Sequence, residues 1–344
     1  AEIARKPSSP YSDKLTPKQI KIILNRSIIQ SERYRTMKAA GYSEDEIKAA
    51  FRKKQEMTVF TYHGDIDTLM SPLDSIRYYK SFLRSGFMSM DPKTGAVKAY
   101  VGGLDYPHFM YDMVSLGRRQ VGSTIKPFLY SLAMSNGFQP CDLAPNRQQT
   151  YMVAGRPWTP RNANHSRAGQ MVPLSWGLAQ SSNWVSAYLM SKLNPQQFVQ
   201  MLRDFGINSP DIHASMSLCL GPCEVSVSEM VSAYTVFANH GIRTAPMFVS
   251  RIEDTEGNTI ATFQPRMNEV ISADNAMKML TMLMGVVDNG TAGRLRYRYN
   301  LEGQIGAKTG TTNNNSDGWF IGFTPQLVSG CWVGGEERDI HFDS

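Results

Sequence analysis

Apolar residues follow two different spacings along this chain of 344 residues. In five stretches they recur every three or four positions, which is typical of an amphipathic helix, and two of these stretches open with a capping pattern. Ser43 is followed three residues later by Glu46, a capping-box pattern, and Ser71 is followed by Pro72 and Asp74. The predicted helices cover Leu15–Arg35, the stretch from Ser43 to Phe51, Ser71 to about Leu83, Glu224–Asn239 and Ala273–Val287.

Apolar and polar residues alternate near both ends of the sequence, which predicts strands. Two alternating runs between Gly86 and Gly102 flank Asp91–Gly95 and indicate a β-hairpin. Three more strands are expected at 304–309, 319–324 and 327–334. Between about 123 and 271 the pattern is mostly helical, with loops rich in Gly, Pro and Asn. Strands at both ends with helices between them predict one α+β domain whose antiparallel sheet pairs the two ends.

The net charge of +6 is not spread evenly over the chain. Residues 1–60 contain 13 basic and 7 acidic residues, whereas residues 61–344 contain 23 of each. A neutral main body is not suited to gripping a phosphate backbone, so nucleic acid is not an expected partner. No run of 18 apolar residues occurs, so no membrane span is predicted within the sequence.

The four cysteines show no metal-binding spacing. No C-x-x-C pair or neighbouring His cluster accompanies them, and neither a metal site nor a cofactor is predicted. Cys219 and Cys223 bracket a Leu-Gly-Pro turn and would form a small disulfide in an oxidising compartment. We favour the alternative that they are free thiols packed as small apolar groups.

Candidate chemistry begins at Ser123-Thr-Ile-Lys126, the only S-x-x-K in the sequence. An apolar helix is expected to follow it, and residues three apart share one helix face, so the Lys126 amine can reach the Ser123 hydroxyl. A hydroxyl needs a neighbouring base to act as a nucleophile. An ordinary lysine is protonated at neutral pH, so burial and a second cation would have to lower the pKa of Lys126 by about 3 units.

Two further short motifs follow in order. Ser181-Ser-Asn183 opens an apolar helix, and by itself is better explained by helix capping, so that only its order and spacing behind Ser123 give it interest. Lys308-Thr-Gly310, followed by Thr311, is expected on a strand, where Lys308 and Gly310 face one side and Gly310 lets a ligand approach the backbone. The same letters at Lys93–Gly95 indicate only a hairpin turn. Trp158, Asn162 and Asn164 precede Ser181 in a polar stretch, where a loop is favoured over a cleft lining.

The order S-x-x-K, S-x-N, K-T-G occurs in penicillin-binding proteins and class A β-lactamases. The sequence resembles the transpeptidase domain of a class A (bifunctional) penicillin-binding protein from about residue 60 onward. The resemblance extends to Arg119-Gln-Val-Gly-Ser-Thr-Ile-Lys-Pro-Phe128, to Gly221-Pro-Cys-Glu-Val-Ser-Val-Ser-Glu-Met230, to Val286-Val-Asp-Asn-Gly-Thr-Ala292 and to Asp317-Gly-Trp-Phe-Ile-Gly-Phe-Thr-Pro325. It implies the serine transpeptidase fold shared with β-lactamases, an antiparallel sheet flanked by helices with an all-helical subregion.

The resemblance also implies a role for each motif residue. Ser123 would be the acylated nucleophile and Lys126 its base, while Ser181 would pass a proton to the leaving group between Lys126 and Lys308. Asn183, Thr309, Gly310 and Thr311 would bind substrate, with Lys308 and Thr309 holding its terminal carboxylate. The backbone N–H groups of Ser123 and Thr311 would form the oxyanion hole. The implied partners are D-Ala-D-Ala stem peptides of peptidoglycan, an acceptor amine and β-lactam antibiotics.

The resemblance predicts a division of the chain at residue 60. Residues 1–60 would be a basic helical remnant of an upstream glycosyltransferase domain and linker, and 61–344 the transpeptidase domain, apparently without its C-terminal helix. The implied location is extracytoplasmic, in the cell envelope, with membrane association through an anchor absent from this chain.

Three other functions remain open at this stage. A serine β-lactamase would need a deacylating base such as the Glu of an E-x-x-L-N loop, and no such stretch occurs. A D,D-carboxypeptidase uses the same residues with water as acceptor. A non-catalytic penicillin-binding sensor module would keep the fold, although every motif residue is present.

Overall fold

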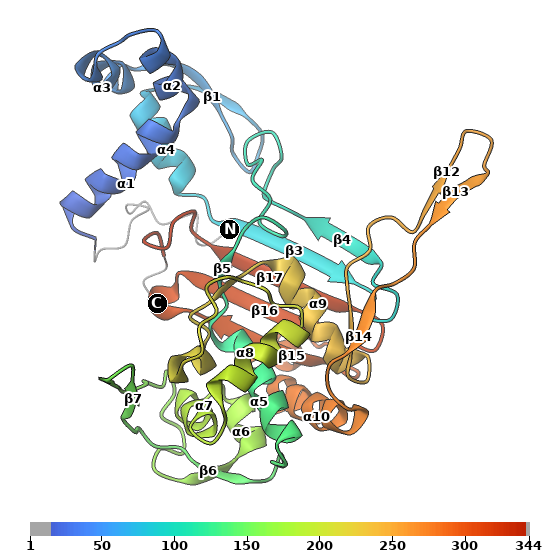
Figure 1. Cartoon of the computed structure of the whole chain (residues 1–344). Coiled ribbons are helices and arrows are strands. Elements are labelled where there is room, and N and C mark those ends of the chain that lie inside the picture. Colours follow the sequence, from blue (N-terminus) through green and yellow to red (C-terminus); the bar gives the residue numbers. More distant parts are fainter. Residues whose placement is uncertain (1–14, 342–344) are drawn as a thin grey trace.

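A five-stranded antiparallel sheet joins segments that lie far apart in the sequence (Figure 1). The computed structural model describes residues 15–341. The strand order is β15–β16–β17–β3–β4. The bounds are β3 (Arg84–Met90), β4 (Val97–Val101), β15 (Gly306–Thr311), β16 (Asp317–Phe323) and β17 (Val328–Gly334). The predicted hairpin and the pairing of the two ends are confirmed, and each C-terminal strand lies within two residues of its expected position.

One face of this sheet is covered by helix α9 (Val227–Ala238). Along β17, alternate residues from Val328 to Gly334 are buried, as expected for a strand with one covered face. Gly330 lies under α9, and a Cβ atom there would come within 2.4 Å of Val231 Cγ2. The missing side chain therefore sets how closely α9 approaches the sheet.

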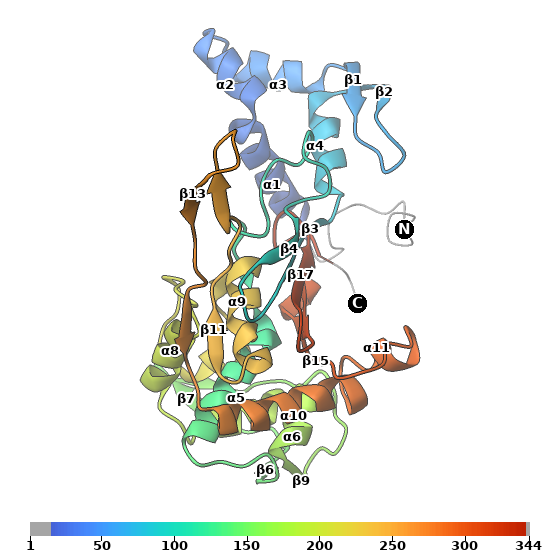
Figure 2. The same ribbon diagram turned by 90° about the vertical axis from the view of Figure 1, so that its right-hand side faces the viewer.

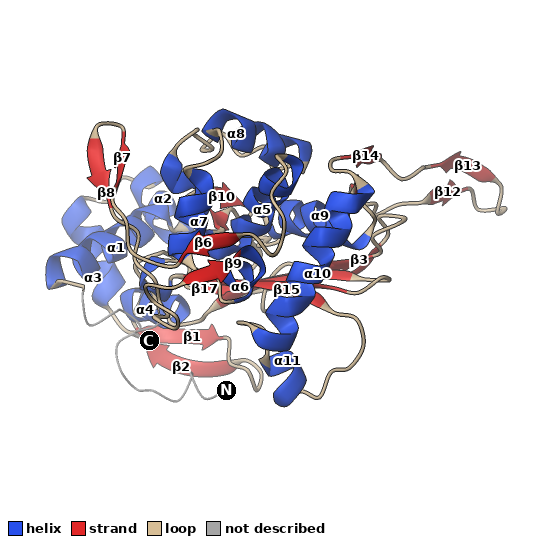
Figure 3. Cartoon of the chain, turned by 90° about the horizontal axis from the view of Figure 1, so that it is seen from below, coloured by secondary structure: helices blue, strands red, loops and turns tan. Residues whose placement is uncertain are grey.

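The remaining helices of the large domain lie beside and beneath the sheet (Figures 2 and 3). Helix α10 crosses the end of β15 and also packs against α5 and α6. This region holds most of the buried apolar residues, including Phe128, Phe205 and Phe237 in ring contact. The bounds are α5 (Lys126–Ser135), α6 (Leu174–Ala179), α7 (Asn183–Met190), α8 (Pro195–Asp204), α10 (Ala273–Asn289) and α11 (Arg294–Tyr297).

Residues 15–83 form a separate group of elements above the sheet in Figure 1. Helix α4 packs against α1 and α3, and a two-stranded hairpin connects α3 to α4. An aromatic cluster of Phe60, Phe82 and Phe109 ties this group to the loop that follows β4. The bounds are α1 (Pro17–Gln30), α2 (Glu32–Ala39), α3 (Glu44–Arg52), β1 (Gln55–Val59), β2 (Ile66–Met70) and α4 (Pro72–Lys80).

The prediction of one helix over Leu15–Arg35 was wrong near its C-terminal end, where the chain breaks into two helices at Ser31. Ser31 has extended backbone angles, its N–H donates to the Ile28 carbonyl, and its hydroxyl accepts from the Tyr34 N–H. It therefore ends α1 and caps α2, because a serine side chain can replace a helical backbone bond. Helix α4 also ends at Lys80 rather than near Leu83, where the chain turns toward β3. The Ser43 capping box and the helix it opens are confirmed.

The two later helices differ from the prediction only at their ends. Helix α9 starts at Val227, behind a capping box formed by Ser226 and Glu229, because Glu224 and Val225 pair as strand β10 with Arg119–Gln120, strand β5. Helix α10 continues two residues past Val287. Cys219 and Cys223 are buried free thiols, as we favoured.

Short strand pairs were missed in the region expected to be mostly helical. One of them, the β12–β13 hairpin, projects from the body at the upper right of Figure 1. These strands have three or four residues each, too few for an alternating pattern to be detected. Their bounds are β6 (Leu143–Pro145), β7 (Tyr151–Val153), β8 (Arg156–Trp158), β9 (Met171–Pro173), β11 (Ile242–Thr244), β12 (Arg251–Glu253), β13 (Thr259–Thr262) and β14 (Met267–Glu269).

A buried ion pair fastens α4 to the segment after β17. Lys80 is 3% exposed, and its Nζ donates to Glu336 at 3.0 Å and to Glu337 at 2.7 Å. We predict that Lys80→Ala lowers the free energy of unfolding by about 2 kcal/mol, because the mostly buried Glu337 loses its short ion pair, whereas Glu336 keeps Arg84 at 2.7 Å. Chemical denaturation measures the change. Arg77→Ala on the same helix is the control and should cost under about 1 kcal/mol, since the Arg77–Asp74 pair is exposed. Equal losses would contradict the prediction.

Candidate active site

Ser123 lies in a tight turn directly before α5. Residues Gly122–Ile125 form a 3-10 helix (η2), and Lys126 is the first residue of α5, so the predicted helical S-x-x-K begins in the tighter form. Residues three apart eclipse each other in that geometry. Gly122 has a φ of +53°, and its N–H donates to the Gly221 carbonyl. The turn therefore requires a left-handed backbone at residue 122, which glycine adopts without strain.

Lys126 is fully buried and directed toward the second motif. Its Nζ donates to the Ser181 carbonyl at 2.6 Å, to Ser181 Oγ at 3.2 Å and to Asn183 Oδ1 at 2.7 Å. These acceptors use all three N–H groups of an ammonium. Among the described residues, none forms a hydrogen bond with the Ser123 hydroxyl. The expected proton path from Ser123 to Lys126 is therefore not a formed hydrogen bond in this arrangement.

Lys308 approaches the same hydroxyl from the sheet. Its Nζ donates to Ser181 Oγ at 2.9 Å and to the Thr309 carbonyl at 2.8 Å, and its side chain is fully buried. Burial lowers the pKa of Lys126 to about 7. Burial, together with the neighbouring Lys126 charge, also holds the pKa of Lys308 well below its ordinary value. Desolvation and like charge both disfavour two ammonium groups here, so one amine can lose its proton near neutral pH.

Ser181 occupies an unusual backbone position. Its φ is +54°, in the left-handed region that residues other than glycine rarely adopt. The helix-capping role belongs instead to Ser182, whose hydroxyl accepts from the Val185 N–H at 3.2 Å. The strained turn directs both the carbonyl and the hydroxyl of Ser181 toward Lys126. Strain of this kind persists where the surroundings impose it.

Asn183 is held by hydrogen bonds to both ends of its side-chain amide and to its backbone N–H. Its Nδ2 donates to the Arg161 carbonyl at 2.6 Å, while its backbone N–H donates to Asn162 Oδ1 at 2.7 Å. Asn162 also accepts from the Trp184 N–H and so caps the start of α7. Asn162 lies in a loop, as favoured from the sequence, and its side chain also supports Asn183 directly. Nothing in the sequence singles it out from Asn164, whose side chain only closes a local turn with Ser166.

The third motif lies on β15, an edge strand of the sheet. Lys308 and Gly310 are buried, whereas Thr309 is half-buried and Thr311 is exposed, as the alternation predicted. A Cβ at Gly310 would lie 2.7 Å from Thr124 Cγ2 and 2.9 Å from the Val121 carbonyl oxygen. The missing side chain therefore lets η2 pack against β15, and the expectation that Gly310 lets a ligand approach the backbone stays a prediction. Lys93–Gly95 closes the β3–β4 hairpin, as predicted.

A buried carboxylate behind the site was not singled out from the sequence. Asp317 is fully buried and accepts from Arg119 Nε at 2.7 Å, Trp332 Nε1 at 3.0 Å and the Thr312 hydroxyl at 2.8 Å. The Arg119 guanidinium also stacks on the Trp332 ring. Both Arg119 and Asp317 begin stretches that carry the family resemblance, which was the available signal. The ion pair links the strand before Ser123 to the turn after Thr311.

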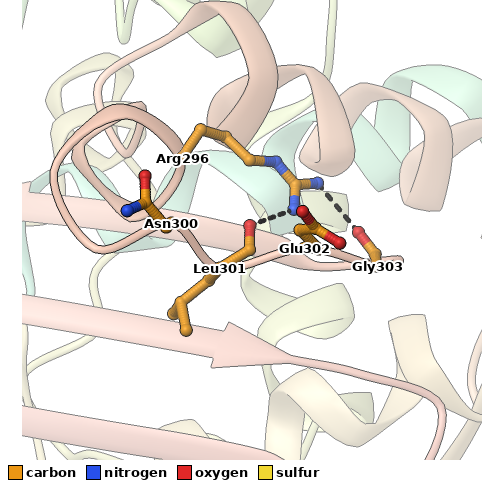
Figure 4. A pocket seen from close by; sticks show the side chains of 5 residues that line it. All are labelled: Arg296, Asn300, Leu301, Glu302 and Gly303. Atoms are coloured by element: carbon orange, nitrogen blue, oxygen red, sulfur yellow. Dashed lines mark hydrogen bonds between the residues drawn. The ribbon is translucent and has the colours of Figure 1, made fainter.

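A cavity of about 440 Å³ lies outside the serine–lysine cluster (Figure 4). It is lined by the loop Asn300–Gly303 and by Arg296, which donates to the Leu301 and Gly303 carbonyls and to Asp288. None of its lining residues is a predicted site residue. Within residues 15–341, no group of His, Cys, Asp and Glu has the arrangement of a metal site, and no helix is long and apolar enough to cross a bilayer.

Comparison with known proteins agrees with the geometry. The sequence profile described as "Penicillin binding protein transpeptidase domain" matches residues 85–330. The chain belongs to this family. A second profile, "Penicillin-binding protein middle domain", matches residues 6–83. The recognition drawn from the motifs is confirmed, while the division at residue 60 stays a prediction.

Curated relatives and solved structures extend the comparison. Penicillin-binding protein 1A of Neisseria lactamica is 35% identical over 261 residues, which are 73% of this chain and 32% of that protein. The corresponding protein of Aquifex aeolicus is 33% identical, over 73% of this chain and 34% of its own length. The chain thus spans about a third of the length of these relatives.

Among solved structures, penicillin-binding protein 1A from Haemophilus influenzae has a TM-score of 0.71 at 22% identity, over 87% of this chain and 56% of that chain. PonA1 from Mycobacterium tuberculosis in complex with penicillin V has a TM-score of 0.63 at 22% identity, over 92% and 85%. These similarities confirm the predicted fold class.

The positive φ at Ser181 generates a stability test. We predict that Ser181→Gly is more stable than Ser181→Ala by about 1 kcal/mol, although both lose the hydroxyl, because glycine adopts φ of +54° without strain. Chemical denaturation of the two variants gives the difference. Ser191 has an ordinary φ of −67°, so there the glycine variant should be the less stable one. The same order at both positions would refute the strain.

Proposed function

We propose that this chain is a peptidoglycan D,D-transpeptidase that crosslinks stem peptides through a serine acyl-enzyme. The observation that carries the proposal is the Ser181 hydroxyl held between two buried lysine amines, beside the turn that bears Ser123. A hydroxyl flanked by two amines of lowered pKa can move a proton without bulk water. Membership of the transpeptidase family supports the same reaction.

In the proposed acylation, Ser123 Oγ attacks the carbonyl carbon of the penultimate D-Ala and its proton passes to neutral Lys126. The developing oxyanion accepts from the backbone N–H groups of Ser123 and Thr311. Contact between η2 and the end of β15 supports this pairing, since a Cβ at Gly122 would lie 3.0 Å from the Thr311 carbonyl oxygen. The peptide C–N bond then breaks, and the nitrogen of the departing D-Ala takes the proton of the Ser181 hydroxyl. The protonated Lys126 returns a proton to Ser181 Oγ.

In the proposed second half-reaction, the amine nitrogen of a neighbouring stem attacks the ester carbonyl carbon. The new amide C–N bond forms, the ester C–O bond breaks, and a proton from the attacking amine passes through Lys126 to Ser123 Oγ. In the first half-reaction, before D-Ala departs, Asn183 and the strand Lys308–Thr311 hold the donor, with Thr309 donating to its terminal carboxylate. Asn183 Oδ1 now accepts from Lys126, so substrate would have to share or replace that bond. β-Lactams would acylate Ser123 in place of the donor. The stem peptides place the reaction outside the cytoplasm, in the cell envelope.

The nucleophile assignment predicts a mass change. Incubation with benzylpenicillin should add one drug mass to the folded wild-type protein, and peptide mapping should locate it on Ser123. Ser123→Ala should show no adduct, because the other hydroxyl in this turn, that of Thr124, is buried and donates to the Val121 carbonyl at 2.7 Å. Ser115→Ala, an exposed serine in the loop before β5, is the control and should be labelled like wild type. An adduct on Ser123→Ala would contradict the assignment.

The wild-type adduct also separates the alternatives. A single burst with nitrocefin supports a transpeptidase, whereas many turnovers for each Ser123 would support a β-lactamase. Release of D-Ala from a stem-peptide mimic without any crosslinked product would support a carboxypeptidase. Absence of labelling on the wild type would leave a non-catalytic binding module.

The lowered pKa of Lys126 predicts a pH dependence. The neutral amine is the base, and its fraction increases as pH rises through about 7. The acylation rate of benzylpenicillin should therefore increase about tenfold from pH 6 to pH 8 and then level off. Stopped-flow or quenched labelling measures the rate, with thermal unfolding at each pH as the control for folding. A flat or falling profile over this range would contradict the role of Lys126.

A further inference from the structure

The turn after α10 contacts both the α6–α7 turn, which bears Ser181, and strand β15, which bears Lys308. Gly290 is packed so closely on the α6–α7 turn that a Cβ there would lie 2.3 Å from the Ala179 carbonyl oxygen. The Thr291 N–H donates to that carbonyl at 3.1 Å, and Gln180 Nε2 donates to the Asn289 carbonyl at 2.7 Å. Asn289–Thr291 is therefore fastened to the segment that immediately precedes Ser181.

The side chain of Thr291 reaches the opposite wall. Its hydroxyl lies 2.7 Å from the hydroxyl of Thr309 on β15, a hydrogen-bond distance. Thr291 is exposed and Thr309 is half-buried, so the pair lies at the surface of the site and not in the core. Thr291 thus connects the backbone before Ser181 to the side chain of Thr309.

The hydroxyl pair has two possible proton arrangements. If the Thr309 hydroxyl donates to Thr291, its only proton is already in a hydrogen bond and cannot be donated to a ligand. If Thr291 donates to Thr309, the Thr309 proton is free to be donated to an incoming carboxylate. A bound carboxylate favours the second arrangement, because a hydrogen bond to a charged acceptor is stronger than one between neutral hydroxyls.

We propose that Thr291 is a positioning residue that orients the Thr309 hydroxyl as a donor to the carboxylate of the substrate or inhibitor. The proposal rests on the proposed function, in which Thr309 contacts that carboxylate. Thr291 acts through Thr309 and touches no reacting atom, so it affects recognition of the carboxylate more than the acylation step. Its hydroxyl, rather than its bulk, carries the effect.

The test compares Thr291→Val, which keeps the shape, with Thr291→Ser, which keeps the hydroxyl. Acylation by benzylpenicillin is measured over a range of concentrations, so that the binding constant and the acylation rate constant are obtained separately. The methyl ester of the same penicillin, which lacks the carboxylate, is the matched probe. Thr291→Val should weaken binding of the free acid about tenfold and leave the ester unchanged. Thr291→Ser should behave like wild type.

A double-mutant comparison tests whether Thr291 acts through Thr309. Adding Thr291→Val to a Thr309→Val protein should cause no further loss of binding. Equal losses for the acid and the ester, no loss in Thr291→Val, or an additive loss in the double variant would each overturn the proposal. If Thr291→Val unfolds, the test rests on Thr291→Ser. Binding that is weakened equally for the acid and the ester in Thr291→Ser would overturn the proposal. Wild-type binding of both probes would support it. A wild type that no penicillin acylates would instead overturn the proposed function.

Discussion

The burial of two lysine amines against one serine hydroxyl is the constraint on which this arrangement depends. A buried amine is costly unless each N–H group finds an acceptor. Lys126 finds three on Ser181 and Asn183, and Lys308 finds two on Ser181 and Thr309. These bonds determine the mutual positions of α5, the α6–α7 turn and β15. The left-handed backbone of Ser181 follows from the same requirement, since it presents both oxygens of that residue to one amine.

Close backbone contacts between distant segments complete the arrangement. A Cβ at Gly221 would lie 2.2 Å from the Gly122 carbonyl oxygen, and a Cβ at Gly310 would meet Thr124. Glycines at these positions let η2 lie between the segment around residue 221 and the sheet edge. These contacts hold the turn that bears Ser123, although among the described residues none forms a hydrogen bond with the Ser123 hydroxyl.

A second layer of polar residues supports this cluster from two sides. Asn162 caps α7 beside Asn183, and the Asn289–Thr291 turn fastens the segment before Ser181 to Thr309. On the far side of β15, Asp317 joins Arg119 to Thr312. Such outer contacts fix the rotamers of the residues nearest the chemistry. The site is therefore a property of four chain segments, from before Ser123 to after Thr311, and not of three short motifs alone.

Much of this molecule could be predicted from local sequence. The caps at Ser43 and Ser71, the β3–β4 hairpin and the antiparallel C-terminal strands follow from spacing and turn chemistry, which act over a few residues. The candidate residues Ser123, Lys126, Ser181, Asn183 and Lys308 were also found, because their order resembles one family. Local pattern failed where a single polar residue competes with the helix, as at Ser31, and where strands are too short to alternate.

Only the tertiary structure decided how the motif residues meet. It gave the capping role to Ser182 and left Ser181 to the two amines, filled the space at Gly310 with η2, and assigned Asn162 and Thr291 to the support of the site. The physical reason is that burial, close packing and hydrogen bonds between residues up to 257 positions apart are set by the whole fold. A sequence read by local spacing determines which groups are available, whereas packing determines which of them share a hydrogen bond.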